Sequence, residues 1–83
     1  MAIAFDPAKD AANLAKHGVS LARAEDMVIL ANVADARFDE ARFRAYGLID
    51  GAAHCLAYTV RDGAVRAISL RRAHAKEMKR HAP

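Results

Sequence analysis

The amino-acid sequence predicts an α+β fold: two N-terminal helices packed on one face of an antiparallel sheet, followed by a short C-terminal helix. The sheet prediction depends on Asp50-Gly51 and Asp62-Gly63, which each lie between runs of alternating apolar and polar residues. Asp-Gly favours a tight hairpin because a type I′ turn needs φ > 0 at both central residues. Residues 40–71 therefore predict a three-strand meander within a sheet of about three to five strands. We expect a single domain, residues 1–83.

Helix-capping residues divide the N-terminal part of the chain. Residues 2–5 predict a short edge strand, after which Asp6-Pro7 supplies an N-cap and a residue suited to the first helical position. We expect this helix to run to about His17 and to end at Gly18. Ser20 is expected to cap a second helix of about a dozen residues. The apolar stripe of that helix consists of Leu21, Ala24, Met27, Val28 and Ala31.

The remaining elements follow from weaker patterns and from the two turns. Val33 to Phe38 predicts an extended segment, and Ala73 to Arg80 predicts the last helix. If both turns are two-residue loops, they fix the strand register. The expected pairs in the first hairpin are Ile49–Ala52, Gly47–His54, Phe43–Tyr58 and Arg42–Thr59. Those in the second are Arg61–Ala64, Thr59–Arg66 and Tyr58–Ala67.

The alternation of side chains along these strands gives the sheet two chemically different faces. The expected core face carries Phe43, Ala45, Ile49, Leu56, Tyr58, Val60, Val65 and Ala67, with His54 and Arg71 at its far end. The opposite face carries Glu40, Arg42, Arg44, Tyr46, Thr59, Arg61 and Arg66, and Cys55 is expected there beside Ala57 and Leu70. Four arginines on one face repel one another. Two interpretations stay open: a surface for an anionic partner, or the solvated face common in antiparallel sheets.

Charge is distributed unevenly along the chain. Residues 1–40 hold four Lys or Arg against seven acids, a net charge of −3, whereas residues 41–83 carry +6. A basic half favours a polyanion, above all nucleic acid, as partner. No segment resembles a membrane span or a signal peptide, so we expect a cytoplasmic protein with no membrane partner. The single cysteine, Cys55, is interpreted as a buried thiol.

Several chemical signatures are absent from the sequence. There is no glycine-rich phosphate loop and no Cys or His pair with metal-ligand spacing. Nothing marks a serine or cysteine nucleophile with an adjacent base. We therefore expect no cofactor, and an enzymatic reaction here would proceed without a metal and without a covalent intermediate.

The sequence resembles the BrnT toxins of bacterial type II toxin–antitoxin systems over nearly its whole length. Three groups of residues carry the resemblance. The N-terminal group is Phe5-Asp6-Pro7-Ala8-Lys9, Asn13, Lys16-His17-Gly18-Val19-Ser20 and Ala24. The middle group is Glu40, Arg42 and Gly47. The C-terminal group is Tyr58-Thr59, Arg61, Arg66, Ile68-Ser69, Arg71, Ala73 and Glu77.

This resemblance implies a RelE-like fold and a small ribonuclease that inhibits translation. It also implies a partner, the BrnA antitoxin, with a ribbon-helix-helix fold. The complex would bind operator DNA only through that antitoxin. Two other function classes stay open: a non-catalytic RNA-binding module, and an interaction subunit whose basic face docks an acidic partner segment. A neighbouring reading frame with ribbon-helix-helix character would favour the toxin.

Metal-free RNA cleavage uses the 2′-hydroxyl as nucleophile, and it needs cations around the phosphate with a base and an acid on either side. We assign the charge role to Arg61 and Arg66, assisted by Arg42, because arginine binds phosphate bidentately. Glu40 or His17 is the candidate acid or base. Each residue also has a structural interpretation. Glu40 would form a salt bridge with Arg61, and His17 would be a cation that interacts favourably with the C-terminus of the first helix. The candidate RNA-binding residues are Lys16, Arg44, Tyr46 (which would stack on a base), Arg71 and Arg72.

Overall fold

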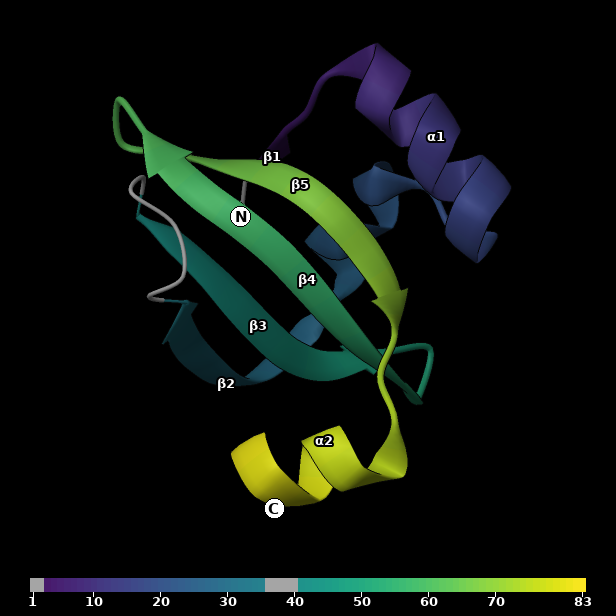
Figure 1. Cartoon of the computed structure of the whole chain (residues 1–83), viewed down its shortest axis with the longest axis vertical. Coiled ribbons are helices and arrows are strands. Elements are labelled where there is room, and N and C mark those ends of the chain that lie inside the picture. The colour runs from purple at the N-terminus through teal and green to yellow at the C-terminus, as the bar shows by residue number, and fades with distance from the viewer. Residues whose placement is uncertain (1–2, 36–40) are drawn as a thin grey trace.

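The computed structural model describes residues 3–35 and 41–83, which form a five-stranded mixed sheet with helices around it (Figure 1). The strands are β1 (Ile3–Ala4), β2 (Val28–Asp35), β3 (Arg42–Ile49), β4 (Ala52–Arg61) and β5 (Ala64–Arg72). The helical elements are α1 (Pro7–His17), the 3-10 helix η1 (Leu21–Asp26) and α2 (Ala75–His81). Strand order is β1-β5-β4-β3-β2, and β1 runs parallel to β5 while the other neighbours are antiparallel. The α+β prediction is confirmed, although the sheet is mixed rather than antiparallel.

The first helix begins and ends where the sequence predicted. The Asp6 carboxylate accepts a 2.8 Å hydrogen bond from the Ala8 amide, which satisfies one of the free N–H groups at the helix start. Gly18 follows His17 with φ +73°, the left-handed conformation that ends a helix. None of the helices in the described residues is long and apolar enough to cross a membrane.

The prediction of a second long helix is wrong. Ser20 does cap a helical segment, but the segment is a six-residue 3-10 helix, η1, that ends at Asp26. Val28 onwards forms β2, whose residues alternate between exposed and half-buried and pair with β3. A short apolar run fits the period of a helix and that of a strand alike. Here the segment forms a strand because it pairs with the edge of β3. The extended segment expected from Val33 is therefore the end of a longer strand, and its residues 36–38 lie outside the described residues.

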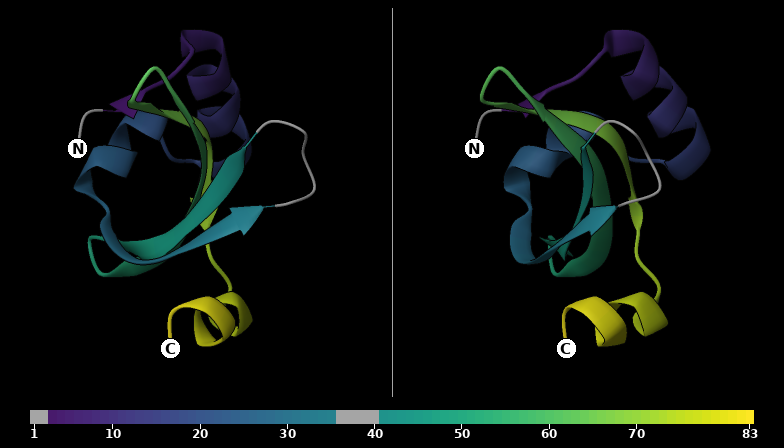
Figure 2. Two further views of the ribbon diagram at one scale, coloured as in Figure 1. Left: turned by 90° about the vertical axis from the view of Figure 1, so that its left-hand side faces the viewer. Right: turned by 60° about the vertical axis from the view of Figure 1, so that its left-hand side comes forward.

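The predicted packing of two helices on one sheet face is also corrected. Of the helical elements in residues 3–35 and 41–83, η1 covers the core face, where Leu21 and Ala24 are buried against sheet residues. Helix α1 lies along the edge of β5 instead, and α2 lies beyond the end of β5 (Figures 1 and 2). The core consists of Leu21, Ala24, Met27, Ala45, Ile49, Leu56, Ala67 and Leu70. Val60, expected in the core, is 49% exposed because it lies at the turn end of the sheet.

Both hairpin registers are confirmed near the turns. Asp50 and Asp62 have φ values of 51° and 52°, and the glycines after them are also positive, as type I′ turns require. All the predicted pairs of the first hairpin form, and so do the three pairs predicted for the second.

A β-bulge changes the second hairpin beyond Tyr58. Ala57 pairs with Ser69 rather than with Ile68, so β5 carries one extra residue at this point. The bulge reverses the faces of the residues that follow. Leu70 becomes part of the core with 0% exposure, and Arg71 pairs with Cys55 on the arginine-rich face. The predictions that Arg71 lies on the core face and that Leu70 lies beside Cys55 are therefore wrong.

The Asn13 side chain of α1 takes the place of a neighbouring strand at the edge of β5. Its amide nitrogen donates to the Leu70 carbonyl at 2.9 Å and to the Val19 carbonyl at 2.8 Å. Its oxygen accepts from the Leu70 amide at 3.0 Å. Among the described residues, β1 pairs with β5 at Val65 and Arg66, and Asn13 satisfies the backbone groups of Leu70 farther along β5. Asn13 is 5% exposed, which makes it a structural anchor of α1.

Asn13→Ala is expected to lower the free energy of unfolding by about 3 kcal/mol, because each buried backbone group left unsatisfied costs about 1–3 kcal/mol. Urea denaturation measures the change. The matched control is Leu14→Ala, since Leu14 is the next residue of α1 and is 52% exposed. Equal destabilisation by the two variants would contradict the anchoring role of Asn13.

Candidate nucleic-acid interface

The arginine-rich face of the sheet lies opposite the face covered by η1. Three neighbouring strands supply it: Arg42 and Arg44 come from β3, Arg61 from β4, and Arg66 and Arg71 from β5. We call these five arginines the basic face. Arg42 pairs with Thr59, and Thr59 pairs with Arg66, so Arg42 and Arg66 lie in one row across three strands. Adjacent strands are about 4.8 Å apart, so the two arginines start about 10 Å apart, with space between them for an anion.

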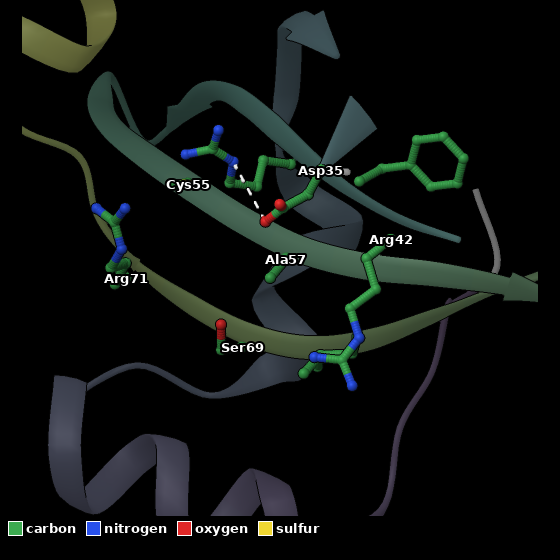
Figure 3. Close-up of a pocket in the computed structure, with 9 residues that line it drawn as sticks. Asp35, Arg42, Cys55, Ala57, Ser69 and Arg71 are labelled. Carbon is green, nitrogen blue, oxygen red and sulfur yellow. Dashed lines mark ion pairs between the residues drawn. The ribbon is translucent and has the colours of Figure 1, made fainter. Parts of the chain in front are cut away.

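The basic face contains two adjoining pockets. The central pocket, of about 370 Å³, is lined by Asp35, Arg42, Arg44, Cys55, Ser69 and Arg71 among others. Figure 3 shows Arg42 and Arg71 towards opposite ends of this pocket, with Ala57 and Ser69 between them. The outer pocket, of about 130 Å³, is lined by Asp6, Lys9, Arg42, Thr59, Arg61 and Arg66 among others. Arg42 lines both pockets, so the two form one continuous basic surface.

The three residues given the charge role in the sequence analysis therefore lie together. Arg42, Arg61 and Arg66 all line the outer pocket. Lys9 lines it as well, although in the sequence Lys9 stands out only through the family resemblance. The available signal was its spacing: Lys9, Asn13 and Lys16 recur at helical intervals and so share one side of α1. Because Asn13 fixes that side against β5, Lys9 is brought to the basic face.

Arg44 and Tyr46 form the part of the basic face that lies against α2. The Arg44 Nη1 donates to the Tyr46 hydroxyl at 3.0 Å, and its Nε lies 4.0 Å from an Asp35 carboxylate oxygen. Tyr46 is 0% exposed, and its ring stacks on His81 of α2 with a centroid distance of 4.7 Å. Burial raises the pKa of Tyr46 to about 12, so the hydroxyl stays protonated near neutral pH. The ring expected to stack on a base is thus already covered by the protein's own helix.

Arg71 is held by a carboxylate from α2. Its Nη1 and Nη2 donate to the two oxygens of Glu77, each at 2.8 Å, and Nη1 also donates to the Arg72 carbonyl at 3.2 Å. This bidentate pair lowers the pKa of Glu77 to about 2 and raises that of Arg71. Glu77 also accepts from the His74 amide at 3.0 Å, which completes the N-terminus of α2. Arg71 therefore enters the central pocket in a fixed orientation.

Lys16, His17 and Arg72 line neither of the two pockets. Lys16 and His17 line a third pocket, of about 240 Å³, between α1 and residues Ile68 and Ser69 of β5. His17 also borders a fourth pocket, of about 340 Å³, with Arg72. Arg72 pairs with His54 and so points away from the basic face. Neither His17 nor Arg72 lines a pocket with Arg61 and Arg66.

Two further groups bear on the chemistry of the site. Glu40, the other candidate acid or base, lies outside the described residues. Cys55 is 3% exposed and unpaired, and burial raises the pKa of its thiol, as the interpretation of a buried thiol requires. Within residues 3–35 and 41–83, no three His, Cys, Asp or Glu side chains are grouped to hold a metal ion.

Comparisons with known proteins agree with this geometry. Residues 5–77 match the family model described as "Ribonuclease toxin, BrnT, of type II toxin-antitoxin system". The crystal structure of the Brucella abortus ribonuclease toxin BrnT matches this fold with a TM-score of 0.68 and 28% sequence identity, covering 87% of this chain and 95% of the Brucella chain. No protein with a curated description matches the chain. Because the family model spans nearly the whole chain, including all five arginines of the basic face, the chain belongs to the BrnT family of ribonuclease toxins of type II toxin–antitoxin systems.

Proposed function

We propose that this chain is a metal-independent endoribonuclease that cleaves RNA on its basic face and thereby inhibits translation in the cytoplasm. The observation that carries the proposal is the convergence of Arg42, Arg61 and Arg66, with Lys9, on one small pocket. Four cations and one carboxylate, that of Asp6, line this pocket of about 130 Å³, and the surplus of positive charge suits a phosphate and the additional charge that develops on it during cleavage. Arginine suits this role because its planar fork contacts two phosphate oxygens at once.

The proposed reaction is attack by the RNA on its own backbone. The 2′-oxygen forms a bond to the adjacent phosphorus, the bond to the 5′-oxygen breaks, and the products are a 2′,3′-cyclic phosphate and a 5′-hydroxyl. Arg61 and Arg66, assisted by Arg42, stabilise the charge on the phosphate oxygens. A base accepts the 2′-proton and an acid protonates the leaving 5′-oxygen. Glu40 or His17 is the candidate for one of these proton transfers, although His17 lines the third pocket rather than the outer one. Lys16 and Arg44 are the candidates for contacts with the RNA on either side.

The family implies a protein antitoxin as partner, since the toxins of type II systems are neutralised by proteins. We propose that this partner is a BrnA-like ribbon-helix-helix protein that covers the basic face. Operator DNA would then be bound by the antitoxin alone. The mixed sheet with helices at its edge is consistent with a RelE-like fold, which we include in the proposal.

The chemistry is tested with wild-type protein and two synthetic RNAs in EDTA. The first RNA is all-ribose and serves to map one cleavage position. The second carries a single 2′-deoxyribose at the nucleotide on the 5′ side of that position. We expect cleavage of the first RNA to a cyclic phosphate and no cleavage of the second. Cleavage of both RNAs at the same position would contradict attack by the 2′-hydroxyl, and dependence of cleavage on added metal would contradict metal independence.

A specific contact favours one alternative, a non-catalytic module that binds RNA or docks an acidic segment. Arg71 already holds a carboxylate, that of Glu77, at the central pocket. An acidic segment of a partner would find the same kind of donors there. On this alternative the protein binds RNA with a steep dependence on salt but leaves it intact.

A further inference from the structure

The Arg71–Glu77 pair links the C-terminal helix to the central pocket. Arg71 is on the basic face only because of the bulge in β5, and it lines the central pocket at the end away from the outer pocket (Figure 3). The Glu77 carboxylate binds the terminal edge of the Arg71 guanidinium, with its two oxygens 2.8 Å from Nη1 and Nη2. The Arg72 carbonyl accepts a further hydrogen bond from Nη1. In the described part of the chain no hydrogen-bond partner faces the Nε-side edge of Arg71. That edge keeps two parallel donors, which suits a second anion.

Glu77 is itself fixed by several contacts, which is what an orienting residue needs. Its oxygens accept from Arg71, from the His74 amide at 3.0 Å and from the Tyr46 hydroxyl at 3.4 Å. Its pKa of about 2 keeps it ionised at any pH at which RNA is assayed. Helix α2 has only seven residues and none of them is buried, so the contacts of Glu77 do much to fix its position.

We propose that Glu77 is a positioning residue that orients Arg71 so that its Nε-side edge binds a second RNA phosphate, at the end of the central pocket away from the phosphate held in the outer pocket. This inference rests on the proposed function, because it assumes that RNA lies across the basic face. Arg42 lines both pockets and so lies between the two phosphate positions. The RNA then presents at least two phosphates across β3 to β5. Helix α2 belongs to the binding site through Glu77.

The test measures binding of a 2′-O-methyl RNA, which the protein cannot cleave, so it does not depend on catalysis. Arg71→Ala is expected to weaken binding about tenfold, the value of one charged hydrogen-bond pair. Glu77→Gln is expected to weaken it by a similar factor, because glutamine keeps the shape and the acceptor for the His74 amide but only half of the fork. The double variant should bind no more weakly than Arg71→Ala, within about twofold, since both changes remove one contact. Glu77→Asp should restore part of the affinity.

The matched control is His81→Ala, which removes the stacking of α2 on Tyr46 without touching Arg71. We expect its affinity to stay within about twofold of wild type. Tighter binding by Glu77→Gln would overturn the proposal, because Glu77 would then compete with phosphate. The proposal would also be overturned if the losses of affinity in Arg71→Ala and Glu77→Gln multiplied in the double variant. A loss of affinity in His81→Ala equal to that in Glu77→Gln would overturn it as well, since Glu77 would then act only by docking α2. If wild type binds RNA as expected here but never cleaves it, the proposed catalysis fails while this inference stands.

Discussion

Arg42→Ala is expected to reduce kcat for RNA cleavage by about 10²–10³-fold, the loss associated with removing one donor to a developing oxyanion. We expect a loss at least as large in Arg61→Ala or Arg66→Ala, because those two arginines carry the main charge role and Arg42 assists them. Arg42 also lines the central pocket, whereas Arg61 and Arg66 line only the outer one, so Arg42→Ala should in addition raise KM. Steady-state cleavage of a short RNA measures the effect, with thermal unfolding of each variant as a check on the fold.

Two comparisons make the Arg42 result interpretable. Lys79→Ala removes one positive charge from an exposed position of α2 that lines none of the pockets described above, so it corrects for net charge. Arg42→Lys keeps the charge but loses the planar fork, and it should recover only part of the activity. A loss in Arg42→Ala no larger than that in Lys79→Ala would contradict the placement of substrate over the basic face.

Gly47→Ala is expected to be the most destabilising single substitution, costing about 3 kcal/mol or more in the free energy of unfolding. Gly47 lies on β3 opposite Ile29, beside the bulge of β2. A Cβ at this position would overlap the Val28 carbonyl oxygen, and it would lie 2.9 Å from the Val28 carbonyl carbon and 3.0 Å from the Ile29 Cα. All three atoms belong to the backbone, so no side-chain rotation relieves the overlap and β2 must move away from β3.

The control for this substitution is Gly51→Ala in the first hairpin turn. Gly51 has φ +78° and open space around its Cβ position, so alanine there suffers backbone strain of about 1–2 kcal/mol but no overlap. Urea denaturation of both variants separates the two causes. An effect of Gly47→Ala equal to or smaller than that of Gly51→Ala would mean that β2 and β3 are not packed as described.

Local sequence signals were sufficient to predict the fold where one residue type determines the backbone conformation. Asp6-Pro7 and Gly18 bound α1, and the two Asp-Gly turns set both hairpin registers near the turns. The run after Met27 carried no such signal. Its apolar residues fit a helix and a strand alike, and the choice was made by pairing with β3, a contact that sequence periodicity cannot show.

The bulge at Ile68 shows why part of the site could not be predicted. Bulges are often marked by glycine, but this one lies between Ala67 and Ser69 with nothing unusual in the sequence. One extra residue reversed the faces of Leu70 and Arg71, so an arginine assigned to the core face belongs to the central pocket. Period-two reasoning remains correct only up to the first irregularity in a ladder.

The residues of the candidate site divide in the same way, into those that strand register places and those that long-range contacts place. Arg42, Arg61 and Arg66 were placed together correctly because they lie in strands of known register. Tyr46 was placed on the correct face, but nothing in the sequence indicated that α2 would cover its ring. Lys9 was not assigned because its place depends on the contact of Asn13 with β5, across 57 residues of sequence.

The most direct measurement is cleavage of RNA in EDTA by three folded proteins: wild type, the double variant Arg61→Ala/Arg66→Ala, and Lys79→Ala. Each is first separated from any co-expressed antitoxin. The account predicts that wild type and Lys79→Ala cut the RNA at the same positions and that the double variant leaves it intact. Equal cleavage by the double variant would contradict a ribonuclease centred on the basic face. Intact RNA with all three proteins would instead support the non-catalytic alternative.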